Sequence, residues 1–262
     1  DDGGRFSQLL VQQVEHAVDR VVSEFEKDVD TFRVVNEEFE AFLKKQEDFA
    51  NKAEVKTTQV IRGQEDLFLA RRRAASVIEE QNQKVGKLPA SILEFEKTAW
   101  FDVLMLTLLR EGEESERWSR HVSSLELLIW SGLPRKNPEH RQKLLKTIPV
   151  LLKRLRSGLN EIGFDGTQSG PLFEALKVDH KAILLGRDGV ERLDTSKARI
   201  NSDQTSATDE TKVSDQPVEN LPEIGQWLKW EDEGVTYRGK LTWKSTITGV
   251  CIFVNRDGMK VA

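Results

Sequence analysis

The most concentrated chemical signal in the sequence is a run of basic side chains between residues 135 and 156. Eight lysines and arginines stand there against a single acid, Glu139, and leucine, isoleucine and valine residues separate them. A helix of this kind binds an anionic lipid surface or an acidic partner, unless it is only the solvated face of a bundle helix. The surface of this basic helix is formed by Arg141, Lys143, Lys146, Lys153, Arg154 and Arg156.

A second group of candidates combines aromatic and basic residues near the C-terminus. Trp243 is able to stack on a base or a peptide, and Arg238 and Arg256 are able to hold a phosphate through bidentate bonds. The alternative is that Trp227, Trp230 and Trp243 form the core of a very small barrel. We select Arg238, Arg256 and Trp243 as the candidate ligand-binding residues.

Motifs that carry catalysis are missing from the sequence. It has no Walker loop, no Gly-x-Gly-x-x-Gly, no His-Glu-x-x-His and no Cys-x-x-Cys. Residues 166–170, Gly-Thr-Gln-Ser-Gly, resemble a nucleophile elbow only superficially, because the serine stands one place late, so a loop is expected there. A structural role is expected for His180. The single cysteine, Cys251, excludes a disulfide framework. We therefore expect no metal site, no cofactor and no catalytic residue.

Helices must position these groups over most of the chain. Between Phe6 and Arg62 there is neither Gly nor Pro, and apolar residues recur at alternating steps of three and four, which predicts one long helix ending at Gly63. The helix over residues 89–111 is apolar nearly all round and should be the central buried helix. Further helices are expected at residues 64–84, 113–130, 138–159 and 171–185.

The amino-acid composition of the chain changes after residue 187. Residues 188–220 are interpreted as a disordered linker, because they carry too few apolar side chains to offset chain entropy. Residues 221–262 contain short β-prone runs separated by glycine turns, including the hairpin signal Asp257-Gly258, and predict about four antiparallel strands. The fold class is therefore mainly α: a multi-helix antiparallel bundle over residues 1–187, followed by the linker and a small, truncated, antiparallel β-barrel-like module.

Charge and hydropathy limit the possible partners. The formal net charge of −5 argues against binding of a nucleic-acid polymer. No apolar run approaches the roughly 20 residues that span a bilayer, so we expect no transmembrane segment and at most a weak contact with a membrane surface. The lone cysteine fits a reducing, cytoplasmic location. A first residue other than Met and a final strand without a partner indicate a fragment of a larger protein.

Residue blocks in both parts of the chain resemble one protein family. The helical blocks are Leu88-Pro89 before a helix, Trp100-Phe-Asp-Val-Leu, Trp130, residues 148–159 and the late His180. The C-terminal blocks are Gly225-Gln-Trp227, residues 238–243 and residues 252–258. Together they resemble the proteobacterial family known as domain of unknown function 1631. Its members are long chains, so the resemblance implies a C-terminal piece.

The last block also looks like the PilZ domain, a small β-barrel that binds cyclic diguanylate. PilZ domains bind this nucleotide through an Arg-x-x-x-Arg loop and an Asp/Asn-x-Ser-x-x-Gly strand. This chain has neither motif, and no two of its arginines stand four residues apart. The resemblance therefore implies a degenerate PilZ-like module.

Three functions follow from these observations. We interpret the chain as a non-enzymatic bacterial regulatory or adaptor protein that acts through protein–protein contacts. The alternative is a signalling effector that binds cyclic diguanylate (cyclic di-GMP), or another anionic nucleotide, through the PilZ-like module. An enzyme, such as a phosphorylase or a hydrolase, is the least favoured hypothesis. The sequence leaves the oligomeric state open.

Overall fold

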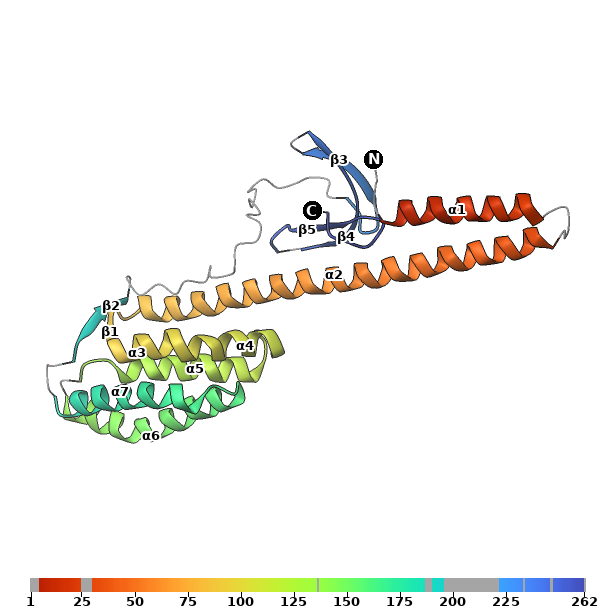
Figure 1. Cartoon of the computed structure of the whole chain (residues 1–262). Helices are drawn as coiled ribbons and strands as arrows, with labels where there is room; N and C mark the ends of the chain where they lie inside the picture. Colours follow the sequence, from red (N-terminus) through yellow and green to blue (C-terminus); the bar gives the residue numbers. More distant parts are fainter. Residues whose placement is uncertain are drawn as a thin grey trace. The chain divides into compact units, whose positions relative to one another are not determined.

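The computed structural model (Figure 1) describes residues 5–24, 30–135, 137–186, 190–195, 222–232, 234–245 and 247–261. The chain divides into two compact units. Residues 1–63 and 209–262 form the first unit, and residues 64–208 form the second. The sequence grouped the first 63 residues with the other helices, whereas the structure groups them with the β-rich C-terminus.

Two helices take the place of the single helix expected between residues 6 and 62. α1 spans Arg5–Glu24 and α2 spans Thr31–Gln83. In the first unit the Arg20 guanidinium of α1 lies 2.5 Å from the Glu38 carboxylate of α2. The expected break at Gly63 is wrong, because α2 continues through it. A glycine inside a helix costs only about 1 kcal/mol relative to alanine, which the helix formers on both sides outweigh.

A three-stranded antiparallel sheet completes the first unit. Its strands, in spatial order, are β3 (Trp227–Asp232), β4 (Val235–Lys244) and β5 (Cys251–Val254). Gly234, with a φ of +79°, lies between β3 and β4, and a bulge between Leu241 and Trp243 interrupts the pairing of β4 with β5. The described residues add one isolated bridge, from Val254 to Lys260, and form no closed barrel. The small antiparallel sheet is confirmed, but its barrel-like form is not.

The sheet is held against α2 at Gly258. This residue has a φ of +75°, and a Cβ atom there would clash with the backbone oxygen of Ala50 and lie 2.7 Å from the backbone nitrogen of Glu54. The Thr57 hydroxyl donates to the Gly258 carbonyl oxygen at 3.1 Å, and Lys240 of β4 forms an ion pair with Glu54 at 2.6 Å. The Asp-Gly pair expected only as a hairpin turn is therefore also the point where sheet and helix meet.

The second unit begins with the last turns of α2. The elements that follow are β1 (Lys87–Pro89), α3 (Ala90–Phe95), the π-helical turn η1 (Glu96–Trp100), α4 (Phe101–Glu111), α5 (Glu116–Ser131), α6 (Pro138–Glu161), α7 (Gly166–Leu184) and β2 (Arg192–Asp194). Along this series α4 contacts α5, α5 contacts α6, and α6 contacts α7 (Figure 1). β1 and β2 pair antiparallel, with Lys87 opposite Asp194.

Side-chain caps fix where two of these helices begin. Asn137 caps α6 by accepting the backbone N–H of Glu139 at 2.9 Å, with proline in the first turn, as the sequence predicted. Asp165 caps α7 by accepting the backbone N–H of Thr167 at 2.9 Å. The expectation of a loop at residues 166–170 is therefore wrong, because the Asp165 cap starts α7 there.

The core of the second unit is centred on Trp100. This residue and Phe95 are fully buried, and the Trp100 indole N–H donates to the carbonyl oxygen of His121 at 3.2 Å. Gly158 of α6 lies directly beside the indole, because a Cβ atom there would stand 2.8 Å from Cη2. The prediction that residues 89–111 are the central buried segment is confirmed, although they form α3, η1 and α4 rather than one uniform helix.

Most of the predicted linker, residues 188–220, lies outside the described residues. The described part, residues 190–195, contains β2, whose Leu193 stands opposite Leu88 of β1. Residues 192–194 of the predicted linker therefore form a strand of the second unit. This strand could not be predicted from the sequence, because three residues are too few to show a clear alternation of apolar and polar side chains.

Candidate functional site

The ligand-binding candidates of the β-module lie at two places. Arg238 is exposed on β4, and its guanidinium carbon lies 5.6 Å from the ring centre of Trp227. Arg256 follows β5 and lines, together with Trp227, a cavity of about 370 Å³ in the first unit. Trp243 is half-buried opposite Ile252 and is not among the described residues that line this cavity. Trp227 therefore pairs with Arg238 and shares a cavity with Arg256, whereas Trp243 does neither.

Three aromatic rings gather on one face of the sheet. Trp230 stacks on Tyr237 with ring centres 5.8 Å apart, and it meets Phe253 at 5.0 Å. Gly239 makes room for this cluster, because a Cβ atom there would lie 2.9 Å from the Cβ of Phe253. Trp230 is therefore packed against other rings, whereas Trp227 keeps 40% of its surface exposed.

The basic residues selected from the sequence all lie on α6. Five of the six are exposed, and Arg141 is half-buried. The Arg156 guanidinium lies over the ring of Phe173 at 5.1 Å, and the Lys143 ammonium lies 5.7 Å from the ring centre of Trp130. The opposite side of α6 is apolar and buries Leu144, Leu151, Leu155 and Leu159. The helix is amphipathic, as its sequence predicts.

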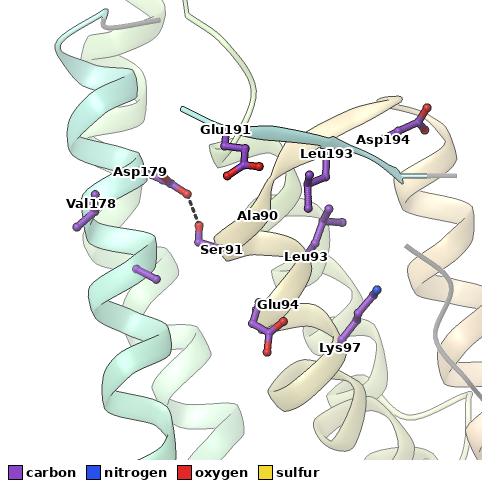
Figure 2. Close-up of a pocket in the computed structure, with 11 residues that line it drawn as sticks. Ala90, Ser91, Leu93, Glu94, Lys97, Val178, Asp179, Glu191, Leu193 and Asp194 are labelled. Atoms are coloured by element: carbon purple, nitrogen blue, oxygen red, sulfur yellow. Dashed lines mark hydrogen bonds between the residues drawn. The ribbon is translucent and has the colours of Figure 1, made fainter. Parts of the chain in front are cut away.

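A groove in the second unit was not indicated by the sequence. It encloses about 810 Å³ and is lined by α3, η1, α7 and the β2 segment (Figure 2). Its apolar lining consists of Ala90, Leu93, Ala175, Val178 and Leu193. Its polar lining consists of Ser91, Glu94, Lys97, Asp179, Glu191 and Asp194. Val178 and Leu193 are 64% and 44% exposed, so apolar surface is available to a ligand.

The groove is negatively charged, since four carboxylates face one lysine. The Ser91 hydroxyl donates to Asp179 at 2.5 Å, which is the bond marked in Figure 2. Glu94 and Glu191 are exposed and form no ion pair with any described residue. Charged groups of one sign beside apolar surface favour a ligand that combines cationic and apolar parts.

Two residues fix the corner that supports the groove. The Arg192 guanidinium donates to the carbonyl oxygen of Gly132 at 2.7 Å. Burial lowers the pKa of Arg192, and the carboxylate of Asp179 opposes this shift. A Cβ atom at Gly132 would clash with Ile92 and stand 3.0 Å from Cδ of Pro89. Glycine at the end of α5 therefore lets β1 and α3 pack closely against this end of the helix.

Sequence reasoning missed this groove because its residues come from three distant segments, 90–97, 175–179 and 191–194. Each segment alone resembles an ordinary helix face or a polar loop. The pairing of β1 with β2 brings these segments together, and no local sequence pattern predicts that pairing.

Glu96 is a buried carboxyl group in η1. It is 1% exposed, and Asn82 Nδ2 donates to its Oε2 at 2.8 Å. Among the described residues, neither the other carboxyl oxygen of Glu96 nor the amide oxygen of Asn82 has a hydrogen-bond partner. Burial raises the pKa of Glu96 from 4.5 to about 8, against the opposing hydrogen bond from Asn82. A protonated carboxyl group is a hydrogen-bond donor, which is the kind of partner that the Asn82 amide oxygen lacks.

Two buried histidines are bonded to hydroxyl groups. His180 Nε2 lies 2.9 Å from Ser131 Oγ, and His121 Nδ1 lies 3.0 Å from Thr107 Oγ1. Each hydroxyl also lies 2.6 Å from a backbone carbonyl oxygen, and a hydroxyl that donates there accepts its second bond from the imidazole nitrogen. Burial lowers the pKa of both histidines. Each bond joins two helices, α5 to α4 at His121 and α7 to α5 at His180.

Two kinds of site are absent from the part of the chain that the structure describes. No group of three or more His, Cys, Asp and Glu side chains could hold a metal ion. No described helix is both long and apolar enough to cross a membrane. The groove and the surfaces of the β-module and α6 remain as candidate binding sites.

Models of two domains from one protein family match the chain. The third domain of the protein of unknown function DUF1631 matches residues 60–177, and the C-terminal tudor domain of the same family matches residues 216–262. The first match covers α3 to α6, and the second covers the sheet of β3 to β5, for which a PilZ-like identity is not confirmed. No curated protein and no solved structure matches the chain. The two matches together cover more than half of the residues, and the chain therefore belongs to the DUF1631 family, of which it contains the third and the C-terminal tudor domains.

Proposed function

We propose that this chain is a non-enzymatic regulatory or adaptor protein that binds a protein partner through the groove beside α3, α7 and β2. The observation that supports this most is the combination of a groove of about 810 Å³, an apolar lining and four carboxylates. A segment that carries lysine or arginine next to an apolar side chain satisfies both features. Its aliphatic part covers Val178 and Leu193, and its cation meets Glu94 or Glu191.

The β-module provides a second contact on the same chain. Trp227 is 40% exposed, and an exposed tryptophan beside an arginine is typical of protein interfaces. Two weak contacts on one chain raise the effective concentration of each for a shared partner. An adaptor of this kind holds its partner without a single tight site.

The test is site-specific photo-crosslinking in the source cells. A photoreactive amino acid replaces Val178, which is 64% exposed at the groove. We expect a crosslinked protein whose attached peptide contains lysine or arginine beside apolar residues. The double variant Glu94→Lys with Glu191→Lys should reduce this product at least about tenfold, because two attractive charge pairs become repulsive.

A matched control reverses two exposed acids of the same unit outside the groove, Asp66→Lys with Glu114→Lys. These changes alter the net charge equally and should leave the crosslinked product unchanged. Equal loss in both double variants, or a product unaffected by the groove variant, contradicts the proposed function.

The second candidate function is binding of an anionic nucleotide such as cyclic diguanylate by the β-module. The pairing of Arg238 with Trp227, and the cavity that Trp227 lines with Arg256, favour it, because a stacking ring and phosphate-binding groups belong to one module. Glu47 and Glu54 line the same cavity and disfavour it, because they repel phosphate. Calorimetry with cyclic diguanylate decides: heat that is lost in the variant Arg238→Ala with Arg256→Ala supports binding, and no heat at high ligand concentration ends the hypothesis.

The absence of enzymatic activity is part of the proposal. The two buried histidines are 6% and 3% exposed, which keeps them from a substrate in solution. The groove offers Ser91 bonded to a carboxylate and no described imidazole in its lining. A panel of phosphorolysis and hydrolysis assays tests this part, and turnover that is lost in Ser91→Ala would refute it.

A further inference from the structure

The solvent face of α6 is a continuous basic surface. Lys146 and Lys153 lie nearly one above the other along the helix, since seven residues make almost two turns. Lys143, Arg154 and Arg156 flank this row, and all five cations are exposed. Between Glu139 and Glu161 the helix carries no acidic residue. None of the five forms an ion pair with a described residue, although the chain as a whole has a net charge of −5.

Apolar side chains lie among these cations. Leu145 is 58% exposed and Val150 is 50% exposed, one on each side of the lysine row. The half-buried ring of Trp130 lies next to the ammonium group of Lys143. Alternation of cations and aliphatic groups on a solvent face, with an aromatic ring at its edge, is typical of a helix that lies on a membrane surface.

We propose that this face of α6 binds the surface of an anionic lipid bilayer. The cations extend from residue 143 to residue 156, about 20 Å of helix, which suits a flat layer of phosphate groups better than a single bound group. An acidic protein segment would pair with the cations but would leave the apolar side chains of Leu145 and Val150 exposed to water. Neither of the two cavities described above includes a residue of α6, so this binding is distinct from the proposed binding of a protein partner.

The test measures partitioning of the full chain onto lipid vesicles. Vesicles of phosphatidylcholine mixed with phosphatidylglycerol are compared with vesicles of phosphatidylcholine alone, at low and at high salt. We expect binding only to the anionic vesicles. The triple variant Lys146→Gln, Lys153→Gln, Arg154→Gln should bind about a hundredfold more weakly, because each cation near an anionic surface contributes roughly a factor of five.

A control variant replaces three exposed lysines of α2, Lys44→Gln, Lys45→Gln, Lys52→Gln, and changes the net charge equally. Its binding should remain within about threefold of the unmodified chain. A second variant, Leu145→Ala with Val150→Ala, should weaken vesicle binding about tenfold and make the remainder more sensitive to salt.

Three results would overturn the proposal: equal binding to neutral vesicles, equal loss in the control variant, or no effect of the two alanines together with equally tight binding to soluble polyglutamate. The last result assigns the face to an acidic protein instead. The replaced side chains are exposed, so circular dichroism should show unchanged helix content in all variants.

Discussion

Replacing Glu96 with glutamine isolates the contribution of one buried proton to the stability of the second unit. The carboxyl group has a pKa of about 8 in the folded chain and 4.5 as its ordinary value. Between these two values the folded chain keeps the proton that the unfolded chain loses. The free energy of unfolding therefore falls as the pH rises through this window, by about 1.4 kcal/mol per pH unit for this group.

Glutamine removes this dependence and keeps the hydrogen bonds. Its amide oxygen accepts from Asn82 Nδ2, and its NH₂ group donates to the Asn82 amide oxygen, which has no other described donor. Glu96→Gln should therefore match the unmodified chain below about pH 5. At about pH 7 it should be more stable by on the order of 3 kcal/mol.

The assay is amide hydrogen exchange by mass spectrometry at a series of pH values, corrected for the intrinsic exchange rate. Peptides from α4 report the opening free energy of the second unit separately from the first. Glu94→Gln serves as the control, because Glu94 is exposed near the same turn and should change stability by less than about 0.5 kcal/mol. If the difference between Glu96→Gln and the unmodified chain is the same at every pH, Glu96 does not hold a proton in the folded state and the reasoning is refuted.

Three further changes test the packing. Gly258→Ala should weaken the attachment of the sheet to α2 by about 2–4 kcal/mol, because the new Cβ meets the Ala50 carbonyl and the φ is positive. Faster amide hydrogen exchange in peptides from β4 would confirm this effect, and an unchanged exchange rate there would contradict it. Gly158→Ala should cost about 1–3 kcal/mol in the second unit by pressing on Trp100, measured by urea unfolding; an equally stable variant would mean that the indole shifts freely. Burial lowers the pKa of both His121 and His180, so each contributes a loss of stability as the pH falls below about 6.5. His121→Gln should remove the His121 share of this loss and flatten the acid unfolding curve without abolishing its slope; curves that stay parallel would contradict it.

Helix periodicity accounts for most of what the sequence predicted correctly. The apolar residues of 89–111 marked the central segment, and Asn137 with the following proline marked the start of α6. These signals are local, so a single segment carries them completely. The same reasoning failed at Gly63, because a glycine lowers helix stability without forbidding the helix.

The groove and the packing of the sheet depend on contacts between distant segments. Leu193 meets Leu88 only because the intervening helices return the chain to its starting point, and Gly258 meets Ala50 across more than 200 residues. Neither contact leaves a periodic pattern in the sequence. The candidate residues on α6 were found because one helix carries them all, whereas the carboxylates of the groove come from three segments.

The pairing of β1 with β2 also determines how the second unit would respond to tension along the chain. A pull enters this ladder at Lys87 and leaves it at Asp194, which are partners at the same end. The hydrogen bonds are then loaded one after another, as in a zipper, rather than all at once. Until this three-residue ladder opens, a pull applied at Lys87 and Asp194 does not extend the chain of the helices from α3 to α7. In an optical-trap experiment, a small early step at low force should therefore precede the release of the helices.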